Sequence, residues 1–149
     1  MGPATTTSEA GPKEDPPSES SRRSRMTTEN ADVARLASLL AATDARSASC
    51  CCFLLHVQPE RLADYVEAHQ DVWAEMREAL TDAGWRNYSL FLRPEDGIVV
   101  GYFEADDCDA AQEAIARASV SLRWEAAMAE YFTPGGGDKQ ILPQYFHLA

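Results

Sequence analysis

The order of hydrophobic patterns after residue 50 restricts the fold of this 149-residue chain more than any other feature. A dense apolar run at 51–57 stops before Pro59 and has the length of a buried strand. Residues 60–83 then carry apolar side chains at helical spacing, and Gly84 is a typical residue for the end of a helix. The sequence therefore predicts a strand followed directly by one helix.

A hairpin and a second helix are predicted next. Residues 87–93 and 98–104 have the apolar content and alternation of strands, and the segment Pro94-Glu95-Asp96-Gly97 between them is rich in turn-forming residues. Asp106 and Asp107 are good helix caps, so a second helix is expected to begin there and to continue through Ala118.

The C-terminal part adds a helical stretch at 122–131 and a final strand at 141–148, separated by the glycines at 135–137. The complete order is strand, helix, strand, strand, helix, strand. This order is typical of the ferredoxin-like split β-α-β-β-α-β fold of the α+β class, in which two helices cover one face of an antiparallel sheet. The other face stays uncovered and its strands are apolar, so we expect it to pack against a second copy of the chain in a homodimer.

The N-terminal part has a different composition. Residues 1–25 contain four prolines and many Ser, Thr and Glu residues with few large apolar side chains, which predicts a disordered tail. Apolar residues at helical spacing in 32–42 predict a short amphipathic helix. We therefore expect two parts: a tail at 1–49 that carries no chemistry and a folded domain at 50–149.

Charge and cysteine content exclude several classes of protein. The formal net charge of −11 would repel nucleic acid and anionic membranes, and neither is an expected partner. No apolar stretch has the length of a membrane span, and no signal peptide is recognisable, so we expect a cytoplasmic protein. Cys50, Cys51 and Cys52 are consecutive and Cys108 stands apart, which fits reduced thiols rather than disulfides or a metal site.

Three residues in the first predicted helix form a candidate site. Tyr65, His69 and Trp73 are each four positions apart, and this spacing places them on one helical face beside apolar residues. An imidazole among apolar and aromatic neighbours is typical of the floor of a pocket. The same spacing also fits ordinary core aromatics with a hydrogen-bonded core histidine.

Further segments agree with a known family in order and separation. They are YVEAHQDVWAE at 65–75, GWRNYSLFL at 84–92, Arg-Trp at 123–124 with Met128, and Phe-His-Leu at 146–148. Together they resemble the L-rhamnose mutarotase family over residues 50–149. The resemblance implies a dimeric α+β barrel that interconverts the α and β anomers of the sugar L-rhamnose and uses no metal or organic cofactor.

The resemblance also implies roles for particular residues. His69 corresponds to the family's proton donor, and Tyr65 and Tyr88 correspond to its sugar-binding tyrosines. Trp124 and Glu125 occupy the positions of the family's aromatic pair, where many members have two tryptophans. Glu125 could bind a sugar hydroxyl, or it could face solvent and leave stacking to Trp124.

These residue types suit anomer exchange. An unperturbed imidazole titrates near pH 6.5 and can act as both acid and base, so His69 is the expected catalytic residue. Tyrosine hydroxyls donate and accept hydrogen bonds, and aromatic faces suit the apolar side of a deoxy sugar, which makes Tyr65, Tyr88, Trp73 and Trp124 candidates for binding. Trp73 fits a core position equally well.

Two other functions are compatible with the same fold. One is a dimeric module that binds a small ligand without catalysis, with His69 and the aromatic residues merely lining the pocket. The other is an oxidative enzyme, either a cofactor-free monooxygenase or a haem-binding protein. The mixture of hydroxyl-bearing and aromatic residues favours a ligand with hydroxyl groups over the oxidative enzyme. A protein that does not exchange sugar anomers would favour the binding module.

Overall fold

The computed structural model describes residues 2, 11, 15–43 and 48–148. The chain divides between Ala41 and Ala42 into two units. The first contains one helix, α1 (Glu19–Ala41), which has no buried residue. It starts inside the segment predicted to be disordered, well before the predicted helix at 32–42, and it ends at Ala41. At its start the Ser21 amide donates to the Ser18 hydroxyl at 3.4 Å, as a helix-capping serine does.

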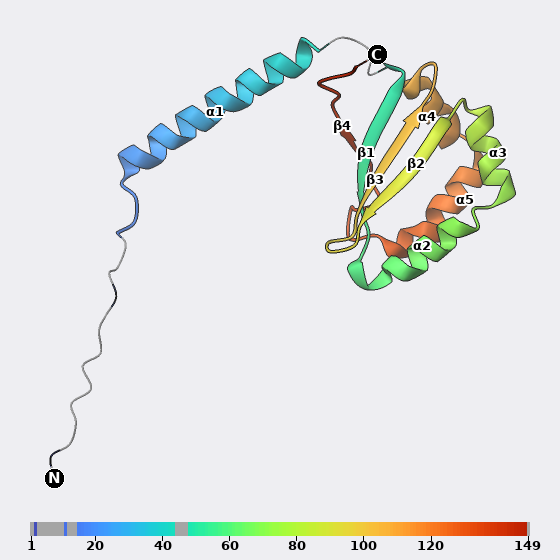
Figure 1. Ribbon diagram of the computed structural model, residues 1–149, viewed down its shortest axis with the longest axis horizontal. Helices are drawn as coiled ribbons and strands as arrows, with labels where there is room; N and C mark the ends of the chain where they lie inside the picture. The colour runs from blue at the N-terminus through green and yellow to red at the C-terminus, as the bar shows by residue number, and fades with distance from the viewer. Residues whose placement is uncertain (1, 3–10, 12–14, 44–47, 149) are drawn as a thin grey trace. The chain divides into compact units, whose positions relative to one another are not determined.

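The second unit is built on a four-stranded antiparallel sheet (Figure 1). Its strands are β1 (Cys50–His56), β2 (Arg86–Arg93), β3 (Ile98–Glu104) and β4 (Gln140–Leu142). They lie in the order β2-β3-β1-β4, with β1 paired to both β3 and β4. This arrangement confirms the predicted ferredoxin-like α+β fold, and β3 has the predicted bounds.

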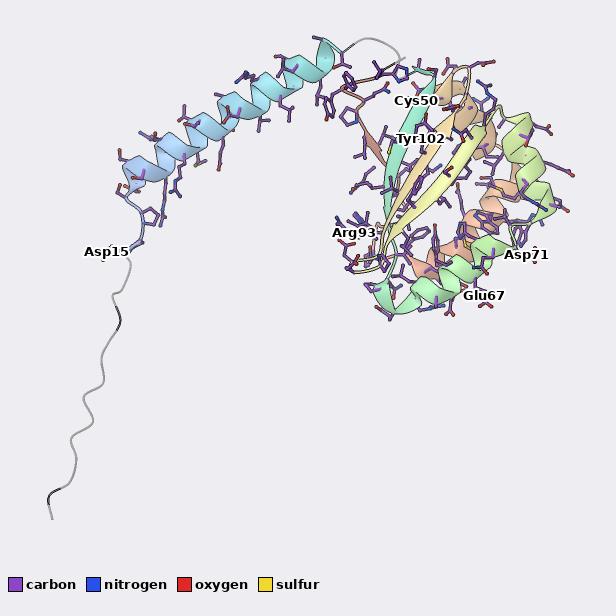
Figure 2. The ribbon with its side chains drawn as sticks, viewed as in Figure 1. Asp15, Cys50, Glu67, Asp71, Arg93 and Tyr102 are labelled. Atoms are coloured by element: carbon purple, nitrogen blue, oxygen red, sulfur yellow. The ribbon has the colours of Figure 1, made fainter. Side chains whose placement is uncertain are left out.

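The helices of this unit cover one face of the sheet (Figure 1). They are α2 (Leu62–Gln70), α3 (Ala74–Asp82), α4 (Cys108–Ala116) and α5 (Ser119–Met128), with short 3₁₀ turns at Pro59–Arg61 and Ala129–Tyr131. Phe53, Val57 and Phe103 are completely buried between the sheet and the helices. Acidic side chains such as Glu67 and Asp71 on the outer side of this layer point away from the sheet (Figure 2). The helices and strands thus share one core.

The ends of two helices follow the sequence signals. After α3 the Trp85 amide donates to the Leu80 carbonyl and the Gly84 amide to that of Thr81, each at 3.0 Å, which is a Schellman motif. This motif requires a positive φ, and Gly84 supplies it at 92°. At the start of α4 the Asp107 carboxylate accepts from the Ala110 amide at 3.0 Å. Both predicted helix ends are confirmed.

The prediction of one continuous helix over 60–83 is wrong. The chain leaves helical geometry at Asp71 (ψ 58°) and Trp73 (ψ 136°), so α2 ends and α3 begins in a new direction. No glycine or proline marks the break. Tertiary packing causes it, because Val72 packs on the core and α3 turns to meet α5, where Arg123 pairs with Glu75 at 2.8 Å.

The last strand is shorter and earlier than predicted. β4 covers three residues, and the predicted strand at 141–148 continues only to Leu142. Pro143 follows directly, and proline has no amide hydrogen to donate to a neighbouring strand. Tyr145, Phe146 and Leu148 are consequently exposed rather than part of the sheet.

Candidate active site

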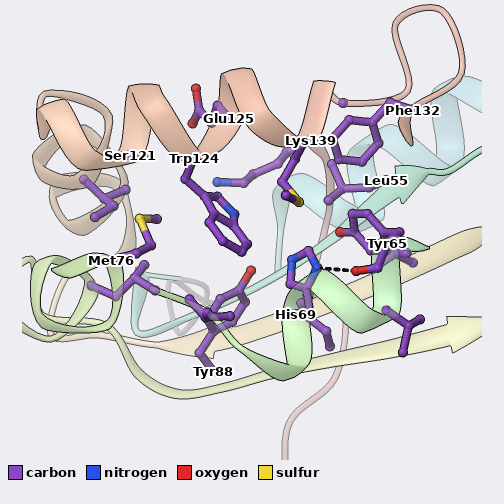
Figure 3. A pocket seen from close by; sticks show the side chains of 18 of the residues that line it. Leu55, Tyr65, His69, Met76, Tyr88, Ser121, Trp124, Glu125, Phe132 and Lys139 are labelled. Atoms are coloured by element: carbon purple, nitrogen blue, oxygen red, sulfur yellow. Dashed lines mark hydrogen bonds between the residues drawn. The ribbon is translucent and has the colours of Figure 1, made fainter. Parts of the chain in front are cut away.

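A cavity of about 810 Å³ lies between the sheet and the helical layer (Figure 3). Residues from α2, α5 and β2 line it, together with the segment before β4. Five of the six predicted site residues are in this lining: Tyr65, His69, Tyr88, Trp124 and Glu125. The structure therefore brings together residues that are 60 positions apart in the chain.

His69 is half-buried on α2, with its imidazole at the cavity. Its Nδ1 is 2.9 Å from the Tyr65 carbonyl oxygen (Figure 3). A carbonyl oxygen only accepts hydrogen bonds, so the proton of the neutral ring resides on Nδ1 and Nε2 keeps a free lone pair. Burial lowers the pKa of His69, and the Tyr65 hydrogen bond opposes this only in part. At neutral pH this ring is an uncharged proton acceptor.

Aromatic rings hold the imidazole in place. The rings of Tyr65 and His69 have centroids 4.3 Å apart, and the Trp124 indole meets His69 edge to face at 5.3 Å. Tyr65 is 4% exposed, and burial raises the pKa of its phenol to about 12. Trp73 does not line the cavity; it packs edge to face behind Trp124 at 5.2 Å and is 39% exposed. Trp73 thus supports the pocket wall from outside.

Tyr88 lies on β2 at the opposite wall of the cavity. Its ring packs edge to face on Trp85 at 4.9 Å, and Trp85 in turn stacks on Phe103 at 3.6 Å with planes 11° apart. The Trp85 indole nitrogen donates to the Ala111 carbonyl at 3.2 Å, which fixes this stack to α4. Tyr88 is 40% exposed as a residue, but desolvation of its hydroxyl raises its pKa well above the usual value, so the hydroxyl stays protonated. It can donate to or accept from a ligand hydroxyl.

Glu125 and Lys139 add opposite charges to the cavity lining. Glu125 is exposed, so its carboxylate can meet both solvent and a ligand. Lys139 precedes β4, and its side chain points into the cavity (Figure 3). Sequence reasoning missed Lys139. A signal was present, because the chain has 11 arginines but only two lysines, Lys13 and Lys139.

The remaining histidines and cysteines of the described residues belong to no candidate metal cluster. Within 15–43 and 48–148, no three His, Cys, Asp or Glu side chains are grouped so as to hold a metal ion. The buried Nε2 of His56 has no partner among the described residues, and His147 is exposed. The four cysteines are free thiols.

The fold and the pocket define a ferredoxin-like α+β domain with a histidine in a cavity of hydroxyl-bearing and aromatic side chains. The sequence profile of the L-rhamnose mutarotase family matches residues 50–148, and the chain belongs to this family. An L-rhamnose mutarotase of Ligilactobacillus salivarius is 34% identical over 101 residues, which are 64% of this chain and 93% of the relative. One of Opitutus terrae is 34% identical over 102 residues, 64% of this chain and 94% of the relative.

A solved structure has the same fold. The crystal structure of an L-rhamnose mutarotase from Formosa agariphila superimposes with a TM-score of 0.56 at 18% sequence identity, covering 67% of this chain and 98% of that one. No helix among the described residues is long and apolar enough to cross a membrane. The family assignment rests on the profile and the relatives, and the crystal structure supports the fold.

Proposed function

We propose that this chain is an isomerase that interconverts the α and β anomers of L-rhamnopyranose at the cavity of His69. The observation that carries the proposal is the state of the imidazole. The Tyr65 carbonyl fixes the proton on Nδ1, and burial keeps the ring neutral, so Nε2 is a base beside a cavity with room for a monosaccharide.

Anomer exchange needs two proton transfers. A base removes the proton of the anomeric hydroxyl while an acid protonates the ring oxygen, and the bond between the anomeric carbon and the ring oxygen breaks. The open-chain aldehyde then rotates and closes on its other face, returning both protons. A positioned acid-base group contributes roughly 10²- to 10⁴-fold to such a rate, so His69 can supply much of the acceleration.

The other site residues bind the sugar in this proposal. Tyr65 and Tyr88 offer hydroxyls to the sugar, and Trp124 offers an aromatic face to its apolar side. Glu125 accepts a hydrogen bond from a sugar hydroxyl at the rim. Trp73 acts by supporting Trp124. No metal or organic cofactor is needed for the reaction, because side chains alone can exchange these protons.

We also propose that two copies form a homodimer through the uncovered sheet face. Phe91, Val100 and Leu54 occupy one register row across β2, β3 and β1. Leu54 and Val100 alternate with the buried residues of their strands, which places this row on the face away from the helices. An apolar row on an open sheet face is typical of a covered surface. A cytoplasmic location stays a prediction from the sequence.

Saturation-transfer NMR on L-rhamnose at equilibrium tests the function. Irradiating one anomeric proton and observing the other measures the exchange rate directly. Wild type should accelerate exchange over a sample without protein, and His69→Ala should abolish this acceleration. Glu67→Ala, on the outer side of the same helix, is the matched control and should exchange at the wild-type rate. A wild type that equals the protein-free sample would instead favour a non-catalytic binding module.

A further inference from the structure

Lys139 is the only lysine in residues 50–149. Its side chain lines the same cavity as His69. Its Nζ is 5.2 Å from the ring centroids of both Phe53 and Trp85. These cation-π contacts hold the ammonium against the cavity wall. The Lys139 ammonium forms no hydrogen bond or ion pair with any of the described residues. Its N–H groups are therefore available to a ligand.

Lysine differs from arginine in a way that matters at this position. A guanidinium keeps its proton at any physiological pH, whereas an ammonium can release one when its surroundings disfavour charge. The chain otherwise uses arginine almost throughout, and one of these arginines, Arg77, also lines the cavity. Lys139 is exposed as a residue, but the partial burial of its ammonium group beside the Phe53 and Trp85 rings lowers its pKa, and the Glu125 carboxylate opposes this in part. Lys139 is thus the cavity cation able to give up a proton.

The chemistry of the site requires such a group. In the proposed reaction Nε2 of His69 accepts the proton of the anomeric hydroxyl when the sugar ring opens, and it acts as a proton donor only when the ring closes. The proton for the ring oxygen therefore comes from another group. Tyr65 and Tyr88 are poor donors for this step because burial raises the pKa of both phenols. A positive group also stabilises the negative charge that develops on the ring oxygen.

We propose that the Lys139 ammonium is the general acid that protonates the ring oxygen of the sugar, opposite His69 as base. This inference rests on the proposed mutarotase function. As the bond between the anomeric carbon and the ring oxygen breaks, Lys139 gives its proton to that oxygen and His69 takes the proton of the anomeric hydroxyl, leaving a carbonyl. When the ring closes on the other face, the neutral amine recovers its proton from the attacking hydroxyl and the imidazolium returns its proton to the carbonyl oxygen.

The exchange rates of three variants test this assignment. Lys139→Met should exchange anomers at least about 100-fold more slowly than wild type, in the usual range for loss of an acid-base group. Lys139→Arg should be similarly slow, because a guanidinium keeps the positive charge but does not release a proton to the ring oxygen. Lys13→Met, at the other lysine and outside the family match, should keep the wild-type rate. If wild type is active and Lys139→Met is equally active, the role of Lys139 is overturned but the proposed function stands. If wild type itself does not accelerate exchange, both the proposed function and this inference are overturned. Full activity in Lys139→Arg overturns the proton transfer.

The pH profile and chemical labelling add independent readouts. The wild-type rate should fall at high pH with a midpoint below the usual lysine value of 10.5, and Lys139→Met should lose this descending limb. The titratable and charged groups that line the cavity with Lys139 are Tyr65, His69, Arg77, Tyr88, Glu125 and Asp138, and Glu125 and Cys51 act electrostatically on its ammonium. Acetylation followed by peptide mass spectrometry should show that saturating L-rhamnose protects Lys139 but leaves Lys13 unchanged. Equal labelling of Lys139 with and without the sugar overturns its contact with substrate.

Discussion

The imidazole of His69 on α2 meets the indole of Trp124 on α5 edge to face, with ring centroids 5.3 Å apart and planes at 86°. Trp124 also contacts Trp73 edge to face, with ring centroids 5.2 Å apart and planes at 89°. The two helices therefore fix the orientation of the proposed base through one indole. This places Trp124 in two roles, as a wall for the sugar and as a support for His69.

Replacing Trp124 should affect both binding and turnover. Trp124→Ala removes the ring contact with His69 and the wall of the cavity, so we expect a raised KM and a kcat reduced by about 10-fold or more, since misplaced catalytic groups lose rate steeply. Trp124→Phe keeps an aromatic ring and should lose less. Exchange NMR at several L-rhamnose concentrations separates KM from kcat. Leu122→Ala on the exposed side of α5 is the control, and unchanged KM and kcat in Trp124→Ala would contradict both roles.

The activity should depend on pH through His69. The base form of the ring is neutral, and burial lowers its pKa below the usual 6.5. The rate should therefore rise with pH through a midpoint below 6.5 and reach a plateau before neutral pH. Exchange NMR between pH 4.5 and 7.5, after subtraction of the protein-free rate, checks this. A midpoint above 6.5 would show that a carboxylate rather than burial dominates the surroundings of the ring.

Gly101 should be intolerant of a side chain. A Cβ at this position would lie 2.2 Å from the Phe53 ring, which is completely buried on the neighbouring strand. Gly101→Ala should lower the free energy of unfolding by about 1–3 kcal/mol, as is usual for overpacking. Urea denaturation measures it. Because the clash is with one ring, the same substitution should cost less in a Phe53→Leu background, and equal costs in both backgrounds would exclude this clash as the cause.

The homodimer has its own test. Val100 is central in the apolar row of the open sheet face, between Leu54 and Phe91, and it does not line the cavity. Wild type should sediment at twice the chain mass of 16.4 kDa, and Val100→Lys should shift it toward the monomer because a charge would be buried. Glu67→Lys on the helical side should remain dimeric. A monomeric wild type would contradict the proposed interface.

The N-terminal 49 residues should be dispensable for catalysis. The family profile begins at residue 50, and α1 has no buried side chain. A chain that begins at Cys50 should retain the exchange rate and the thermal midpoint of the full chain. Exchange NMR and circular dichroism compare the two forms. A large loss of either would place the boundary of the folded domain before residue 50.

Local signals in the sequence determined most elements of the fold. The alternation in β2 and β3, the Gly84 helix end, the Asp107 cap and the order of strands and helices were readable because each depends on neighbouring residues. The pairing of Tyr65 with His69 was readable for the same reason, since helical spacing stacks residues four positions apart.

Tertiary structure alone decided the rest. No local residue marks the break between α2 and α3, which arises where α3 turns to pack on α5. Trp73 precedes α3 directly at this break, and it contacts Trp124 without lining the cavity. Lys139 follows a glycine-rich loop without periodicity, and it reaches the cavity because β4 pairs with β1. Sequence patterns specify contacts between residues close in the chain, whereas these positions depend on packing between elements that are distant in sequence.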